Sequence, residues 1–348
     1  MNLNRVIINH RSVDAGNLQE FTRSWTGDPD LPAFLESWFD PHEGFLAHTS
    51  GSTGKPSVIT LQKKYAVASA RATIGFLGLE SGNTALLSMP ARFIAGRMMI
   101  IRALVGRFDL ITVPPSSTPE IPDHILDLAA FTPHQFQNIL TQSKNKNHRK
   151  IKNVLLGGGP VADELIQSLP DFPGNIYETF GMTETYSHIA LRMRYPVAEP
   201  YFKAVPHVTF TTEDSRLIIH APHLGLPELR THDVVHLEGP HHFKWLGRSD
   251  FVINSGGLKL FPEVIEKKLA GVIQSPYFIT GQPDREFGEK VVLVIQKGDE
   301  TSVAGIQTLI DGILSKYEKP KIIIWIDKMI YTPTGKINRP ETRKHYHI

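Results

Sequence analysis

The chain carries the stretch His48-Thr49-Ser50-Gly51-Ser52-Thr53-Gly54-Lys55-Pro56 between an apolar run, Gly44 to Ala47, and a β-rich run, Val58 to Leu61. Glycines allow backbone N–H groups to turn toward a ligand, and hydroxyl side chains add further donors. A loop of this composition is suited to bind phosphate groups. An ordinary surface turn is the alternative, because clusters of Ser, Thr and Gly usually form loops.

This stretch differs from the phosphate loop of P-loop NTPases, which has the pattern Gly-x4-Gly-Lys-Ser/Thr. Gly51 and Gly54 are too close together, and Pro56 stands where a magnesium-binding hydroxyl should follow the lysine. The sequence therefore predicts a phosphate loop of another kind, placed on a hairpin rather than at the start of a helix.

The composition indicates a globular protein and is compatible with small anionic ligands. A chain of 348 residues favours two domains, and 41% apolar with 21% charged residues is typical of a protein with a packed core. The net charge of +2 is far from the basic surface of a nucleic-acid binder, so no nucleic acid is expected. The absence of cysteine excludes disulfides, thiolate metal sites and a cysteine nucleophile.

The N-terminal stretch Met1 to His10 lacks the charged-then-apolar pattern of a signal peptide. The longest apolar run, Ile94 to Val105, is interrupted by Arg97 and Arg102, so it is not expected to cross a bilayer. We expect a cytoplasmic protein without a membrane span. The sequence does not indicate its oligomeric state.

Strand and helix patterns alternate over the first half of the chain, which predicts an α/β fold with a parallel sheet and loops at its carboxyl edge. The expected helices are Leu18 to Trp25, Leu31 to Trp38, Gln62 to Leu77, Ile94 to Leu104, Pro133 to Gln142 and Val161 to Leu169. The expected strands are Thr84 to Met89, Asp109 to Val113, Leu126 to Phe131 and Ile151 to Leu156.

The pattern changes from Ala198 onward, where short strands predict a β-rich subdomain, and again near Asp250, where an α+β region begins. We therefore expect a large N-terminal domain over residues 1–249 and a small, mobile C-terminal domain over 250–348. The elements expected in the second are helices at Pro262 to Leu269 and Ala304 to Tyr317, and strands at Tyr277 to Gly281, Val291 to Gln296 and Ile322 to Ile326.

Two further stretches suit a nucleotide. Gly157-Gly158-Gly159-Pro160 follows a predicted strand and exposes backbone on which a flat ring can lie. In Tyr177 to Glu184, Phe180 offers an aromatic face, and Thr183 and Glu184 place a hydroxyl and a carboxylate that suit a phosphate and its Mg²⁺. Taken alone, a helix-start turn and a buried phenylalanine would explain both stretches.

The second half of the chain adds an aspartate and a lysine. Asp233 follows a predicted strand and is able to accept hydrogen bonds from a ribose diol, although hairpin aspartates are common. Lys336 lies on a turn near the C-terminus and can neutralise charge that develops on a phosphoryl oxygen. Alone, it would be a solvated loop residue.

In this order, the stretches resemble the adenylate-forming acyl-CoA synthetase superfamily, which includes luciferases and nonribosomal adenylation domains. The resemblance covers roughly residues 44–340. It implies that a carboxylic acid is adenylated with ATP and Mg²⁺, that pyrophosphate is released, and that the acyl group passes to CoA. The residues it implies for nucleotide binding are Thr49, Ser50, Gly51, Ser52, Thr53, Gly54, Lys55, Gly158, Gly159, Pro160, Phe180, Gly181, Asp233 and Arg248.

The resemblance implies catalytic roles for Lys336, Thr183 and Glu184, with Glu184 also holding the Mg²⁺. It implies a hinge at Asp250 about which the C-terminal domain rotates between the two half-reactions. It also implies that Gly256 and Gly257 face the tunnel for CoA.

Three features depart from the superfamily pattern. Ser57 stands where a second lysine is usual, His232 stands where a glycine usually precedes the ribose aspartate, and the segment before the phosphate loop is short. The compact size, the run from Gly181 to Ser187 and the stretch Met89 to Gly96 look most like the o-succinylbenzoate–CoA ligases of menaquinone biosynthesis.

Arg92 and Arg97 are candidates to meet a second carboxylate of such an acid, or else they cap and solvate a helix. His188 either hydrogen-bonds the substrate or packs in the core. Three alternatives stay open: another aryl or acyl acid, a carrier protein in place of CoA, and a nucleotide-binding homologue without catalysis. The presence of both Lys336 and Glu184 argues against the last.

Overall fold

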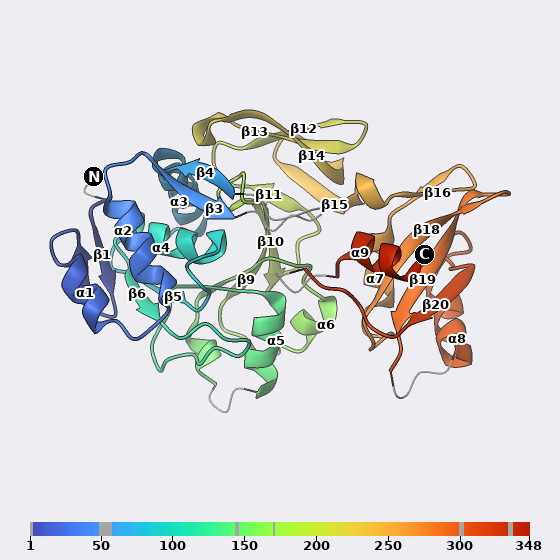
Figure 1. Ribbon diagram of the computed structural model, residues 1–348, viewed down its shortest axis with the longest axis horizontal. Helices are drawn as coiled ribbons and strands as arrows, with labels where there is room; N and C mark the ends of the chain where they lie inside the picture. The colour runs from blue at the N-terminus through green and yellow to red at the C-terminus, as the bar shows by residue number, and fades with distance from the viewer. Residues whose placement is uncertain (1–2, 49–57, 143–145, 170, 299–302, 333–336) are drawn as a thin grey trace.

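The computed structural model describes residues 3–48, 58–142, 146–169, 171–298, 303–332 and 337–348 (Figure 1). The chain begins with an antiparallel hairpin, β1 (Arg5–Ile8) and β2 (Arg11–Asp14), which the sequence did not predict. Two helices follow, α1 (Leu18–Ser24) and α2 (Asp30–Phe39), and confirm the two helices expected there.

A parallel sheet forms the centre of the first half of the chain, as predicted. Strand β1 pairs with β6, β6 with β5, β5 with β7, β7 with β8 and β8 with β9, all in parallel. These strands are β5 (Thr84–Leu87), β6 (Asp109–Thr112), β7 (Leu128–Phe131), β8 (Asn153–Leu156) and β9 (Asn175–Gly181).

Helices cover both faces of this sheet (Figure 1). α3 (Lys63–Leu77) and α4 (Ile94–Gly106) pack on one face with α2, whereas α5 (Pro133–Gln142) and α6 (Asp163–Gln167) belong to a second buried cluster on the other. Helix α4 is apolar on nearly all sides and is buried accordingly. Helix α6 is shorter than the helix predicted over Val161 to Leu169.

The β-rich segment continues the same sheet and does not form a separate layer, which the sequence did not reveal. A short turn after β9 leads into β10 (His188–Tyr195), which runs antiparallel to β9 and extends the sheet outward. The complete order is β12-β13-β14-β15-β11-β10-β9-β8-β7-β5-β6-β1-β2. The added strands are β11 (Phe202–Ala204), β12 (Thr209–Glu213), β13 (Arg216–Ala221), β14 (Leu226–Leu237) and β15 (His242–Arg248). Short 3₁₀ turns lie at η1 (Asn147–Lys150) and η2 (Pro222–Leu224).

A two-stranded hairpin, β3 (Gly44–His48) and β4 (Val58–Gln62), stands apart from the large sheet. The two strands pair antiparallel from Gly44 with Gln62 to His48 with Val58. This pairing confirms that the predicted phosphate stretch joins two strands of a hairpin.

The chain after β15 forms a second sheet with its own core, seen at the right of Figure 1. The 3₁₀ turn η3 (Ser249–Phe251) links the N-terminal lobe, residues 3–248, to this C-terminal lobe, residues 253–348. The lobe contains β16 (Ile253–Ser255), β17 (Leu258–Leu260), α7 (Pro262–Leu269), β18 (Tyr277–Asp284), β19 (Gly288–Gln296), α8 (Val303–Ile313), β20 (Ile322–Ile326) and α9 (Arg339–Tyr346). We retain residues 1–249 and 250–348 as the proposed domains.

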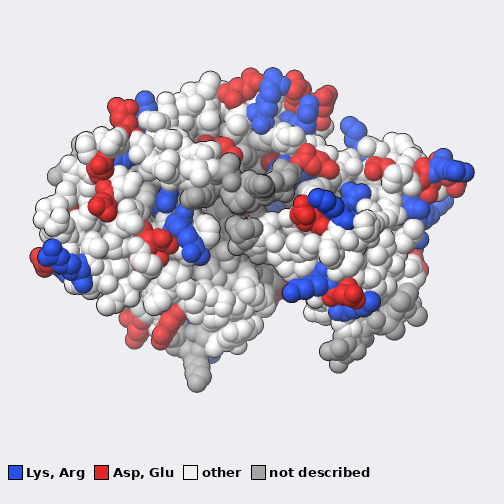
Figure 2. Space-filling view, viewed as in Figure 1, with Lys and Arg blue, Asp and Glu red and all other residues white. Residues whose placement is uncertain are grey.

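Acidic and basic side chains lie interspersed on the face shown in Figure 2, most densely along its upper edge and over the C-terminal lobe. Within the described ranges, no helix is long and apolar enough to cross a membrane.

Candidate active site

The predicted phosphate-loop residues Thr49 to Lys55 and the predicted catalytic Lys336 lie outside the described residues. The strands β3 and β4 nevertheless locate the hairpin. The main-chain N–H of Gln62 on β4 donates to the hydroxyl of Tyr186, with 3.2 Å between nitrogen and oxygen. This contact holds the hairpin beside the turn that carries Thr183 and Glu184.

The glycine-rich turn follows β8 at the carboxyl edge of the parallel sheet, where ligands of open α/β folds bind. Glycine is favoured at position 157, because a Cβ there would lie only 2.5 Å from the hydroxyl of Thr179 on β9 and would force that side chain to shift. Gly158 adopts a φ of +84°, which favours glycine. A Cβ on Gly159 would meet no atom within 4 Å, so the backbone of this turn is open on its outer side.

The turn between β9 and β10 holds Thr183 and Glu184 at the same edge. Gly181 allows the two strands to meet, since a Cβ there would collide with the carbonyl oxygen of Ser187. The hydroxyl of Thr185 stabilises the turn by accepting the N–H of Met182 at 2.9 Å. Thr183 is buried and Glu184 is exposed on this turn.

Phe180 lies at the end of β9 and is half-buried. Its ring packs against Phe243, with 5.0 Å between centroids, and Phe202, with 5.7 Å. The packing against β11 and β15 fixes the orientation of the Phe180 ring, and β9 is the parallel neighbour of β8, which leads into the glycine-rich turn.

Asp233 and Arg248 are direct partners across β14 and β15, so the structure brings together the two residues predicted to bind ribose. Asp233 is 7% exposed, and its Oδ1 accepts the indole N–H of Trp245 at 2.8 Å. Burial raises the pKa of Asp233, while the bond from Trp245 and the charge of Arg248 oppose this. The carboxylate therefore has a fixed orientation and a second oxygen for another donor.

The predicted hinge residue Asp250 contacts Arg248 and His232. Its carboxylate pairs with Arg248 Nη2 at 2.7 Å and with His232 Nδ1 at 2.8 Å. His232 is not among the residues with positive φ, so the strand accommodates a side chain where the superfamily usually has glycine. The His232 side chain reaches outward to the hinge.

A second polar group lies buried behind the β9–β10 turn. The Nε2 of His188 is 2.9 Å from the Thr73 hydroxyl on α3, and its Nδ1 is 3.2 Å from the Ser187 hydroxyl. Burial, and to a smaller degree the charge of Arg102, lowers the pKa of His188 well below its usual range. The ring of His188 is therefore neutral at pH 7.

Arg102 of α4 completes this group and was missed by the sequence reasoning, which treated it only as an interruption of an apolar run. The side chain is 2% exposed, and Nη2 donates to the Ser187 hydroxyl at 2.7 Å. No carboxylate among the described residues forms an ion pair with it, its Nε has no hydrogen-bond partner there, and burial lowers its pKa to about 9. A basic residue within an otherwise apolar helix is the signal that could have revealed it.

The two arginines that the sequence suggested for a substrate carboxylate lie just before and within helix α4. Arg97 donates from Nε to the carbonyl of Ala91 at 2.8 Å and from Nη1 to the carbonyl of Leu46 on β3. Arg92 is exposed, with its guanidinium 5.0 Å from the ring centroid of Phe93. The contacts of Arg97 support the hairpin, and the assignment of Arg92 and Arg97 to a substrate carboxylate stays a prediction.

Gly256 and Gly257 form the tight turn between β16 and β17 in the C-terminal lobe, with φ values of +57° and +80°. The N–H of Gly256 donates to the carbonyl of Phe287 at 2.8 Å. Their assignment to a CoA tunnel stays a prediction.

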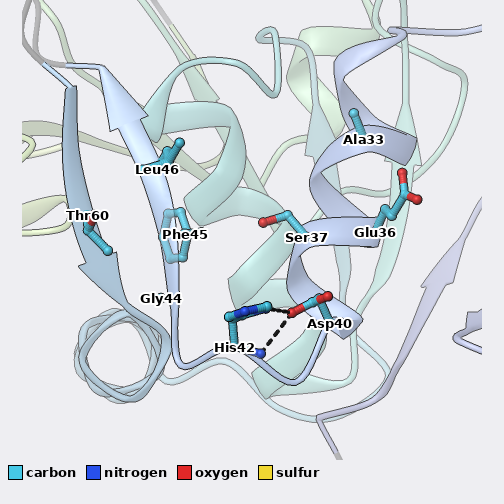
Figure 3. Close-up of a pocket in the computed structure, with 9 residues that line it drawn as sticks. All are labelled: Ala33, Glu36, Ser37, Asp40, His42, Gly44, Phe45, Leu46 and Thr60. Atoms are coloured by element: carbon cyan, nitrogen blue, oxygen red, sulfur yellow. Dashed lines mark hydrogen bonds and ion pairs between the residues drawn. The ribbon is translucent and has the colours of Figure 1, made fainter.

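Figure 3 shows a cavity of about 410 Å³ between α2 and the β3–β4 hairpin. His42 and Asp40 close one end of it, and the main-chain N–H of His42 donates to the Asp40 carboxylate at 2.9 Å. None of the site residues predicted from the sequence lines this cavity.

The fold and the order of these site elements define a nucleotide-binding α/β enzyme with a separate C-terminal lobe. The AMP-binding enzyme family matches residues 4–224, and the chain belongs to that family.

Two known ligases have sequences similar to most of this chain. The chain is 23% identical to the 2-succinylbenzoate–CoA ligase of Listeria monocytogenes serotype 4b, over 92% of this chain and 73% of that protein. It is 24% identical to the enzyme of the same name from Enterococcus faecalis, over 84% of this chain and 67% of that protein.

Among solved structures, an acyl-CoA synthetase (AMP-forming)/AMP-acid ligase II-like protein from Dyadobacter fermentans is 32% identical, with a TM-score of 0.60, covering 91% of this chain and 93% of that one. The O-succinylbenzoate coenzyme A synthetase (MenE) of Bacillus subtilis, in complex with ATP and magnesium, is 18% identical with a TM-score of 0.74. That match covers 86% of this chain and 69% of the other and shows a shared fold.

Proposed function

We propose that this protein is an ATP-dependent acid–CoA ligase that acts on 2-succinylbenzoate, a step of menaquinone biosynthesis. In the first half-reaction the substrate carboxylate attacks the α-phosphate of ATP and releases pyrophosphate. In the second half-reaction the thiol of CoA attacks the acyl-adenylate and releases AMP. The names of the related ligases support this substrate.

The observation that carries the choice of acid is the buried, unpaired charge of Arg102. A charge removed from water without a partner is unfavourable, so a site that retains one is suited to bind the opposite charge. An acid with two carboxylates supplies one group for adenylation and a second, negatively charged partner for Arg102. One carboxylate is adenylated near Thr183 and Glu184, and the other pairs with Arg102 behind the same turn, beside Ser187.

The residues present suit ATP and Mg²⁺. The backbone at Gly158 and Gly159 is open and leaves room for a flat ring. The sequence resemblance assigns Phe180 as the aromatic side chain of the same site. The free oxygen of Asp233 and the guanidinium of Arg248 suit a ribose diol. Glu184 is exposed at the edge where it can hold Mg²⁺, which would neutralise phosphate charge when bound.

The remaining roles follow from the sequence. Thr49 to Lys55 are proposed to hold the phosphates, and Lys336 to stabilise the charge that develops during adenylation. Catalysis of this kind depends mostly on positioning and on electrostatic stabilisation, because the protein supplies no covalent intermediate.

The test is pyrophosphate release from ATP with a panel of carboxylic acids, with and without CoA. Release that requires 2-succinylbenzoate, followed by formation of its CoA thioester, is the expected result. Turnover with another acid would show that the ligase acts on that acid instead. Turnover without use of CoA would favour a carrier protein as the acyl acceptor. No turnover with any acid would refute the ligase and favour a nucleotide-binding homologue without catalysis.

A further inference from the structure

Helix α7 of the C-terminal lobe contacts the end of β15 in the N-terminal lobe through Glu263. A Cβ on Gly247 would overlap the Oε2 atom of Glu263, so the carboxylate rests directly on the Gly247 backbone. Gly247 precedes the linker η3 and Glu263 follows it, and this contact therefore spans the proposed hinge at Asp250.

The same carboxylate faces Arg339 at the start of α9. Arg339 Nη1 is 3.6 Å from Glu263 Oε1, and Arg339 Nη2 is 2.6 Å from Glu266 Oε2. The guanidinium also lies 4.8 Å from the ring centroid of Phe251, the last residue of the linker. Glu263 therefore stands between the end of β15 and an arginine that follows Lys336 by three positions in the sequence.

Glu266 differs from Glu263 because its contacts stay within the C-terminal lobe. Its Oε1 accepts the main-chain N–H of Ile279 on β18 at 2.7 Å. Arg339 is thus anchored to its own lobe by Glu266, while Glu263 alone of the two carboxylates reaches the N-terminal lobe.

The contact across the linker is buried but incompletely satisfied. Glu263 Oε2, Arg248 Nε and Arg339 Nη1 are all buried and have no hydrogen-bond partner among the described residues. Buried polar atoms without hydrogen bonds are unfavourable, so the Glu263–Arg339 pair stabilises this orientation less than a fully satisfied pair would. A contact of this strength is suited to a joint that must open and close.

We propose that Glu263 is a positioning residue that holds the C-terminal lobe in the orientation seen here by linking the end of β15 to Arg339 across the linker. The role rests on the proposed function, since it assigns this orientation to the adenylation half-reaction. Loss of the Glu263 charge frees the lobe to adopt other orientations. Adenylation then slows, while acyl transfer from a preformed adenylate continues.

A second ion pair between the lobes offers a matched control. Lys267, also on α7, lies 3.0 Å from Asp163 on α6. Both side chains are about half exposed, and exposed pairs contribute little. Lys267→Met therefore removes a charge between the lobes without touching the buried contact.

The orientation of the lobes can be measured directly because the chain contains no cysteine. Gln137→Cys on α5 and Gln307→Cys on α8 place spin labels at exposed positions on the two lobes. In the parent and in Lys267→Met we expect one dominant distance, and in Glu263→Gln a second population. Identical distance distributions in the parent and Glu263→Gln would overturn the proposal.

The half-reactions supply the second readout. Glu263→Gln is expected to lower the rate of pyrophosphate release about tenfold, as for the loss of one charge-assisted contact, and to leave thioester formation from supplied acyl-adenylate within about twofold. Glu266→Gln, which removes only a contact within the lobe, should leave the distance distribution unchanged. Equal loss of both half-reactions in Glu263→Gln would contradict a positioning role.

The two experiments separate this inference from the proposed function. The distances are recorded without substrate, so they test Glu263 even if the acid is a different one. A parent protein that adenylates no acid would refute the ligase function. If the parent is active but Glu263→Gln has the same distance distribution as the parent, only the positioning role is refuted.

Discussion

Replacing Arg102 by methionine tests the substrate pocket and the stability of the core in one variant. Methionine retains much of the length of the side chain and removes its charge. Arg102 is 2% exposed, and burial lowers the pKa of its guanidinium well below the usual range, to about 9. At about 1.4 kcal/mol for each tenfold change in proton affinity, keeping this charge buried costs up to about 5 kcal/mol, before the bond to Ser187 offsets part of it.

The variant should therefore be as stable as the parent or more so, by on the order of 1–3 kcal/mol, since apolar replacement of buried charges often stabilises a protein. Its activity should fall. Without Arg102, the second carboxylate of 2-succinylbenzoate has lost its proposed cationic partner, and kcat/KM for adenylation should drop about 10²-fold or more.

The assay compares 2-succinylbenzoate with an analogue in which hydrogen replaces the second carboxylate. Parent protein should prefer the diacid strongly, and Arg102→Met should lose that preference while its activity on the analogue is retained. Arg97→Met is the matched control, because Arg97 donates to the main chain of Ala91 and Leu46. It should reduce the stability in urea without changing the preference.

Two results would refute this reasoning. If Arg102→Met lowers activity on the diacid and on the analogue equally, Arg102 does not bind the second carboxylate. If Arg97→Met or Arg92→Met removes the preference instead, the original sequence prediction for those arginines is correct.

Lys336→Ala should abolish pyrophosphate release yet leave thioester formation from supplied acyl-adenylate largely intact, and equal loss of both would contradict rotation of the C-terminal lobe. Burial raises the pKa of Glu266 to about 7, so this group binds a proton more tightly in the folded protein than in the unfolded chain. The free energy of unfolding should fall as pH rises from about 4.5 to 7, and less so in Glu266→Gln; parallel pH profiles in urea titrations would exclude this linkage. Gly181→Ala should destabilise the protein by about 2–4 kcal/mol, because its Cβ would collide with Ser187, whereas Gly312→Ala, with nothing within 4 Å, should be neutral or slightly stabilising. Similar denaturation midpoints for these two alanine variants would show that the β9–β10 turn can shift.

Local patterns predicted much of the fold correctly. The Ala-rich helix over Gln62 to Leu77 occurs as α3 and ends at Gly78 in the left-handed conformation, as its terminal glycine indicated. Helix α7 and strand β20 match their predicted bounds. These elements carry their signal within one short stretch, because helical and strand periodicity are properties of neighbouring residues.

Pairing between distant strands was not visible in the sequence. Nothing local indicated that β10 would pair antiparallel with β9 and join the parallel strands to the β-rich segment in one sheet. Strand pairing depends on which sheet edges remain open after other segments have packed. The pairing therefore depends on contacts between residues that are far apart in the sequence.

For the candidate site, the sequence by itself determined the class of chemistry, because the residues from Thr49 to Lys336 occur as ordered short motifs whose side chains suit phosphate, ribose and Mg²⁺. The structure decided which charges meet. It placed Asp233 opposite Arg248, engaged Arg97 with the main chain, and buried Arg102 beside Ser187. It also brought Glu263 against Gly247 across the linker. Motif chemistry is local, whereas burial and pairing arise only when distant segments exclude water together, and that exclusion turns an ordinary arginine into a candidate carboxylate receptor.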